Sequence, residues 1–94
     1  MEFDFLNFKT PNEIQLEIAK NVREKRKKLK LTQKEFAKKS GVSFGSIKRF
    51  ENTGEISLFS LVKIALVLNC EDEFLNLFKQ KQYDSIEEII NGKY

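Results

Sequence analysis

The sequence predicts a single, small, all-helical domain. Helix start and stop signals divide it into five or six short segments, it contains one proline, and it shows no alternating strand pattern outside residues 3–5 and 83. Its 94 residues are close to the usual size of one domain, about 100–150 residues. The domain is expected over residues 12–79, between an N-terminal extension (1–11) and a C-terminal tail (80–94) with a candidate sixth helix from Ser85 to about Asn91.

The first helix is expected to run from Pro11 to about Leu29. Thr10 is placed to cap it, proline occupies the first helical position, and Glu13 completes a capping box. An apolar stripe at helical spacing indicates the side that meets the core; it consists of Ile14, Ile18, Val22 and Leu29.

Two short helices follow. Thr32 and Glu35 form a second capping box, for a helix through about Lys39. Gly41 fits a left-handed turn position, because glycine adopts positive φ without steric cost. Ser43 is the expected cap of a third helix through about Glu51, which residues 52–54 then break.

The fourth helix is the most apolar. Ser57 caps it, it runs from Leu58 to Leu68, and Asn69 can end it. Because it is apolar nearly all round, we expect it at the centre of the core. A fifth helix is expected from Glu71 to Phe78, and Cys70 between the two is expected to be a small buried side chain.

Composition excludes most enzyme chemistry. The chain has no histidine and one cysteine, so it cannot form a histidine-based triad, a histidine metal site or a thiolate zinc cluster. It also lacks the glycine-rich phosphate loops. We therefore expect no enzyme, no cofactor and no metal.

The same composition bears on location. No apolar run approaches the roughly 20 residues that span a bilayer. The N-terminus, MEFDFLNFK, lacks the pattern of a secretory signal, and a lone cysteine favours a reducing compartment. A cytoplasmic protein with no membrane partner is expected.

Charge is strongly segregated along the chain. Of its 17 basic and 14 acidic residues, segment 20–49 holds 12 and 2, which leaves 5 and 12 for the rest. The basic run from Lys25 to Lys30 repels itself, and a polyanion would relieve that repulsion. The alternative interpretation is a solvated helix face. A basic part joined to an acidic part suggests two partners of opposite character.

The spacing within residues 33–52, QKEFAKKSGVSFGSIKRFEN, indicates a specific motif. Ala37 is small where the next helix would cross closely, Gly41 provides the elbow, and Ile47 would pack back near Ala37. Two helices then meet at a steep angle, and the second presents its outer face to a groove.

The residues of this segment are similar to those of a known family of proteins. The segment from about Ile18 to Phe78 resembles the Xre/Cro-type helix-turn-helix DNA-binding domains of phage repressors and bacterial regulators; the similar stretches are VREKRKKLKLTQKEFAKKSGVS, SIKRFENTGE and SLFSLVKIALVLNCEDEFLNLF. The resemblance implies a lambda-repressor-like five-helix bundle that binds a double-stranded operator as a homodimer. Lys30 stands where this family commonly has a helix-ending glycine or asparagine.

The resemblance also implies residue roles on the DNA. Phe44, Gly45 and Arg49 match positions that face base edges, and Arg49 is favoured because a guanidinium can bond guanine bidentately, with a phosphate contact as the alternative. Phe44 is left open between a thymine methyl and the protein core. Phosphate contacts are implied for Gln33, Ser43 and Ser46, and backbone contacts for Lys28, Lys48 and Asn52.

A structural pair is implied as well. Arg26 and Glu51 match a family salt bridge between the first and third helices, which positions these elements more than it stabilises the fold.

The acidic, aromatic flanks are not explained by DNA binding, since phosphate would repel EFDFLNF and YDSIEEIINGKY. The pattern SIKRFE…GEISL…LVKIAL resembles antitoxins of Hip-type toxin–antitoxin operons, where the DNA-binding protein partners a kinase-like toxin and represses its own promoter. The flanks would then contact the toxin or a second protomer. The alternative is that their apolar residues only cap the small core: Phe3, Phe5, Phe8, Ile86, Ile89 and Ile90.

The leading hypothesis is therefore a homodimeric, sequence-specific transcriptional repressor of the bacterial cytoplasm and nucleoid, acting as the antitoxin of an operon that it autoregulates. Two alternatives stay open. One is a protein-interaction module whose main task is binding and neutralising a kinase-like toxin. The other is a stand-alone phage Cro-like repressor.

Overall fold

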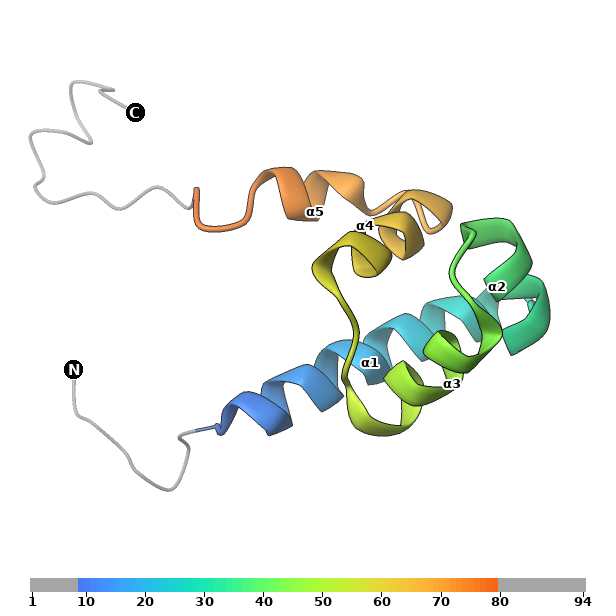
Figure 1. Ribbon diagram of the computed structural model, residues 1–94. Coiled ribbons are helices and arrows are strands. Elements are labelled where there is room, and N and C mark those ends of the chain that lie inside the picture. The colour runs from blue at the N-terminus through green and yellow to red at the C-terminus, as the bar shows by residue number, and fades with distance from the viewer. Residues whose placement is uncertain (1–8, 80–94) are drawn as a thin grey trace, which may run out of the picture.

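The protein is a bundle of five helices over the residues that the structure, a computed structural model, describes, which are 9–79 (Figure 1). These helices are α1 (Pro11–Lys28), α2 (Gln33–Ser40), α3 (Phe44–Thr53), α4 (Leu58–Val67) and α5 (Glu71–Leu75). The described residues contain no strand, so the all-helical fold class is confirmed. The candidate sixth helix lies outside the described residues, and α1 begins at Pro11, within the expected extension.

Local capping explains where α1 and α2 begin. At α1 the Glu13 backbone N–H donates to Thr10 Oγ1 (3.1 Å), and the Thr10 N–H donates to the Glu13 carboxylate (2.9 Å). Thr32 and Glu35 repeat this capping box at α2. The hydrogen bond from the threonine N–H lowers the pKa of each glutamate carboxyl, because it stabilises the charged form.

Glycines in the left-handed region end α2 and α3. Gly41 has φ 74° and Gly54 has φ 82°, and each N–H donates to a carbonyl of the preceding helix. A Cβ at Gly54 would lie 2.8 Å from the backbone of Gln15 on α1, so α1 and the end of α3 approach closely. Lys30, at the position where the resembled family commonly has glycine or asparagine, takes φ 59° despite its side chain.

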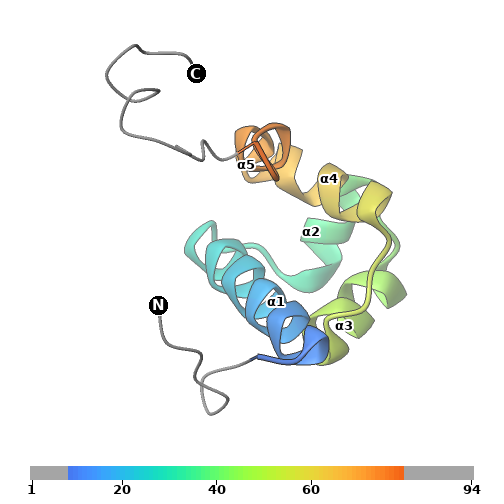
Figure 2. The same ribbon diagram turned by 90° about the vertical axis from the view of Figure 1, so that its left-hand side faces the viewer.

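The core lies where the first four helices meet. Helix α1 packs on α3, α2 packs on α3 and α4, and α5 packs on α4. Figure 2 shows α1 and α3 side by side, with the α4–α5 arm set apart from α1. The buried apolar residues are Ala19, Phe36, Ala37, Val42, Ile47, Phe50, Ile64 and Ala65.

The predicted buried stripe of α1 is wrong for three of its four residues. Ile14, Ile18 and Leu29 are exposed, and only Val22 packs against the core. Helix α1 instead buries Ala19 and Arg26. The reason is that α1 meets α3 along a neighbouring face, where the small Ala19 allows close approach.

The prediction of a central α4 is also only partly correct. Ile64 and Ala65 are buried, but Leu58, Phe59 and Leu66 are exposed, because no described element covers the outer side of this helix. Cys70 is half-buried rather than buried, and burial raises the pKa of its thiol.

Two helix ends differ by more than the usual uncertainty of one residue. Helix α3 continues to Thr53 instead of ending near Glu51, because Gly54 provides the left-handed cap. Helix α5 ends at Leu75 instead of Phe78, which itself has a positive φ of 61°.

We expect Gly54→Ala to destabilise the fold more than Gly41→Ala. Both substitutions put an L side chain in the left-handed region, at a cost of about 1–2 kcal/mol. Only at Gly54 would the new Cβ also collide with the Gln15 backbone, whereas at Gly41 the nearest heavy atom is Lys63 Nζ at 3.8 Å. Chemical denaturation of both variants measures the difference, and equal losses would contradict the close approach of α1.

Candidate nucleic-acid interface

Helices α2 and α3 form two arms joined by the elbow at Gly41. Ala37 and Ile47, one from each arm, are buried in the same apolar cluster. The Ser40 hydroxyl closes the turn, because it donates to the Ala37 carbonyl (3.3 Å) and accepts from the Val42 N–H (3.2 Å). The turn is therefore held by local hydrogen bonds and by the packing of both arms.

Helix α3 has two faces of opposite character. Ile47 and Phe50 are fully buried. The opposite face is exposed and carries polar or small residues at spacings of three and four, namely Gly45, Lys48, Arg49 and Asn52. Gly45 and Arg49, for which base contacts are implied, therefore share one surface with Lys48 and Asn52. Phe44, the third residue with an implied base contact, does not belong to this surface.

Phe44 lies at the start of α3 and packs against the core cluster. The ammonium groups of Lys34 and Lys48 lie 5.4 Å and 5.1 Å from its ring centroid, within the range of a cation–π interaction. In this arrangement the ring links α2 to α3 and holds two positive charges near each other.

The two serines at the start of α3 bond to each other. The Ser46 backbone N–H donates to Ser43 Oγ (3.1 Å), which caps the helix, and the Ser43 hydroxyl donates to Ser46 Oγ (2.8 Å). Ser43 is exposed and Ser46 is half-buried. The cap that the sequence predicted is thus present.

Arg49 extends from the exposed face and pairs with the carboxylate of Glu55. Thr53 shapes the connection between them, because its hydroxyl donates to the Arg49 carbonyl (2.7 Å) and accepts from the Glu55 N–H (3.1 Å). Sequence reasoning missed Glu55. The only feature of the sequence that could have indicated Glu55 is its place as an acidic residue directly after Gly54, which ends α3.

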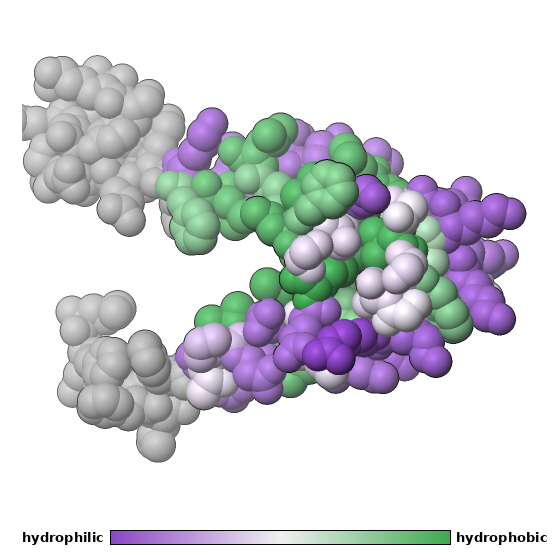
Figure 3. All heavy atoms as spheres, viewed as in Figure 1, coloured by the Kyte–Doolittle hydropathy of each residue, from purple (hydrophilic) through white to green (hydrophobic). Residues whose placement is uncertain are grey.

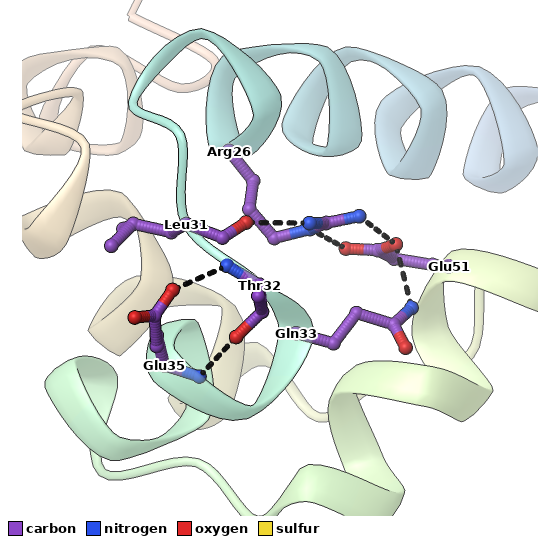
Figure 4. Close-up of polar contacts among 6 residues, drawn as sticks. All are labelled: Arg26, Leu31, Thr32, Gln33, Glu35 and Glu51. Carbon is purple, nitrogen blue, oxygen red and sulfur yellow. Dashed lines mark hydrogen bonds and ion pairs between the residues drawn. The ribbon is translucent and has the colours of Figure 1, made fainter.

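A buried polar cluster lies behind α3 (Figure 4). Arg26 Nε donates to Glu51 Oε2 (2.8 Å), and Arg26 Nη2 donates to Glu51 Oε1 (3.1 Å), so the pair is bidentate. The side chains of Arg26 and Glu51 are only 9% and 3% exposed. The ion pair that the resemblance implied is present, and it joins α1 to α3.

Two further hydrogen bonds complete this cluster. Arg26 Nη1 donates to the Leu31 carbonyl (2.7 Å), and Gln33 Nε2 donates to Glu51 Oε1 (2.9 Å). Gln33 therefore helps to satisfy a buried carboxylate, a role that the sequence did not indicate. Lys28 lies exposed in the last turn of α1, and no ion pair involves it within residues 9–79.

An all-helical domain in which a glycine elbow holds the outer face of a second helix clear of the core is a helix-turn-helix domain. The sequence matches the helix-turn-helix family over residues 22–75, more than half of the chain. The protein belongs to this family, of the Xre and lambda-repressor type, and is a DNA-binding transcription regulator. No curated protein and no solved structure matches the chain.

The described part of the chain shows neither a membrane-spanning helix nor a cluster of metal ligands. None of its helices has the length and apolar character needed to cross a bilayer. Over residues 9–79 no group of three or more cysteine, aspartate or glutamate side chains is arranged to hold a metal ion.

We expect the loss of one member of the buried pair to destabilise the fold strongly. Arg26→Met or Glu51→Leu leaves the other charge buried without its partner, which costs about 3–5 kcal/mol. The double variant removes both charges and is expected to recover much of that loss. Equilibrium denaturation of the three variants tests this, and losses that simply add would contradict a direct pair.

Proposed function

We propose that this regulator is a homodimeric repressor that reads a specific DNA operator with α3. The exposed face of α3 carries the proposal, because a helix held with one face in the core can place the other in the major groove. Segment 20–49 includes Gly45, Lys48 and Arg49 of this face and holds 12 basic and 2 acidic residues, so its charge complements phosphate.

Arg49 is the proposed base-reading residue. Its side chain is 67% exposed, and a guanidinium can donate two parallel hydrogen bonds to guanine O6 and N7. Around Gly45, one turn earlier, no heavy atom outside its neighbours and the backbone of its own helix lies within 4 Å of the place where a Cβ would stand, so DNA can approach the α3 backbone closely. The packing of Phe44 supports a role in holding Lys34 and Lys48 toward the phosphates.

The other polar residues are proposed to contact the sugar–phosphate backbone of the DNA. Gln33 stands at the N-terminus of α2, where the helix dipole favours an anion, and one N–H of its amide is not needed by Glu51. Two protomers would place their α3 helices in successive major grooves about 34 Å apart. The remaining phosphate contacts are Lys28, Ser43, Ser46, Lys48 and Asn52.

We further propose that the operator lies in the protein's own toxin–antitoxin operon, with a kinase-like toxin as second partner. The acidic remainder of the chain, with 5 bases and 12 acids, and the resemblance to Hip-type antitoxins support this. A kinase-like gene beside this one would favour it, whereas surrounding phage genes would favour a Cro-like repressor. Toxin binding that survives Arg49→Ala would favour a separate interaction role.

Arg49→Ala is expected to reduce discrimination between operator and random DNA. A bidentate contact to guanine contributes about 1–3 kcal/mol of discrimination, so the ratio of the two affinities should fall about tenfold. The operator is first selected from a randomised duplex library with the wild-type protein, and both affinities are then titrated at one salt concentration. An unchanged ratio would contradict the assignment of Arg49 to base reading.

Lys28→Ala is expected to weaken operator and random DNA about equally and to reduce the slope of log affinity against log salt by about one. Lys9→Ala is the matched control, because Lys9 is an exposed lysine outside the basic segment and pairs with Glu17. Binding measured over a salt series compares the two variants. Equal slopes for both would remove Lys28 from the interface.

A further inference from the structure

A cleft opens between α1 and the α4–α5 arm, and apolar side chains line both of its sides (Figure 3). Ten large hydrophobic residues are exposed over residues 9–79, and all of them lie on α1, α4 or α5 or in the turns that directly follow α1 and α5. Exposed apolar surface that is concentrated in this way marks a binding surface for another segment or molecule.

The α1 side of the cleft is the stripe that the sequence predicted as buried. Ile14, Ile18 and Leu29 lie on one side of this helix, as their spacing requires. Leu29 borders an open pocket together with Leu31 and Val67, the last residue of α4. This side of α1 therefore faces the α4–α5 arm, and its apolar stripe is exposed because the described residues do not fill the space between them.

The other side ends at the point where the described chain ends. Leu75, Leu77 and Phe78 are exposed, and Phe78 is 99% exposed. Residue 79 follows directly, so the chain leaves α5 at the open side of the cleft, where α1 also begins (Figures 1 and 2). A segment that continues from here can enter the cleft without crossing the molecule.

We propose that residues 80–94 of the same chain fill this cleft. Their sequence has the required pattern, since Tyr83, Ile86 and Ile90 recur at spacings of three and four, with Ile89 beside them. At 1.5 Å per residue, the seven residues from Ser85 to Asn91 would form about 10 Å of helix. Ser85 stands where a helix cap is expected.

One charge on the segment is compatible with this fit. At helical spacing Glu87 borders the apolar stripe of the segment, whereas Asp84 and Glu88 fall on the opposite side. Lys25 stands seven residues after Ile18 and four before Leu29, so it lies on the same side of α1. If the stripe enters the cleft, Glu87 is the acidic residue that can reach Lys25 on α1. This proposal is independent of DNA binding.

The first test uses matched substitutions in the full chain. Ile18 and Leu16 are 40% and 38% exposed and lie on opposite sides of α1. If the tail covers the cleft, Ile18→Ser lowers the melting temperature by about 5 °C or more, whereas Leu16→Ser changes it little. Equal changes in melting temperature for the two variants overturn the proposal, because Ile18 would then be as exposed to solvent in the full chain as Leu16.

The second pair tests the tail itself. Ile90→Asp and Asn91→Asp introduce the same charge, on and off the predicted stripe. Ile90→Asp is expected to lower the melting temperature to a similar extent as Ile18→Ser, and Asn91→Asp to leave it nearly unchanged. If Ile18→Ser destabilises and Ile90→Asp does not, something else covers α1, such as residues 1–8, and the proposal is wrong.

A fluorescence reporter separates the tail of the same chain from a second copy. The chain has no tryptophan, so Tyr83→Trp gives a single signal. A buried reporter emits at shorter wavelength and resists quenching by acrylamide, and Ile18→Ser is expected to reverse both effects. These signals must stay constant over about a hundredfold dilution; a shift on dilution assigns the cleft to a second copy and overturns the proposal.

Discussion

Arg26 and Glu51 meet in the interior of the bundle, where neither charge is tolerable without the other. The transfer of two ions out of water costs more than their attraction returns unless the remaining donors and acceptors are also satisfied. Here the Leu31 carbonyl and the Gln33 amide complete that requirement. Because these four residues come from α1, α2, α3 and the link between α1 and α2, the cluster ties the orientation of α3 to the rest of the fold.

The outer face of α3 is a consequence of this arrangement. Gly41 ends α2 and Gly54 ends α3, both in the left-handed region, and Ser43 caps the start of α3, so the bounds of this helix are set locally. Within α3, Ile47 and Phe50 are held in the core. The polar residues on the opposite side of the helix therefore face solvent. The same glycine at position 54 lets α1 lie close against the end of α3.

Sequence reasoning succeeded where the signal is local. Caps at Thr10, Thr32 and Ser43 and the elbow at Gly41 depend on neighbours within a few residues, and each is present. It failed where the outcome depends on distant packing. The apolar spacing of α1 did not select the side that meets α3, where Ala19 and Arg26 are buried; only the family resemblance indicated that Arg26 pairs with Glu51 of α3. The exposure of Leu58 and Leu66 likewise depends on which elements cover α4.

The pair between Arg49 and Glu55 occupies the guanidinium of Arg49 in the free protein. Glu55 is a tethered competitor for any acceptor of Arg49, present at high effective concentration because it lies only six positions further along the chain. An incoming acceptor must displace it. Because both side chains of the pair are largely exposed, displacing Glu55 costs only about 0–1 kcal/mol, and any acceptor that bonds the guanidinium pays the same cost.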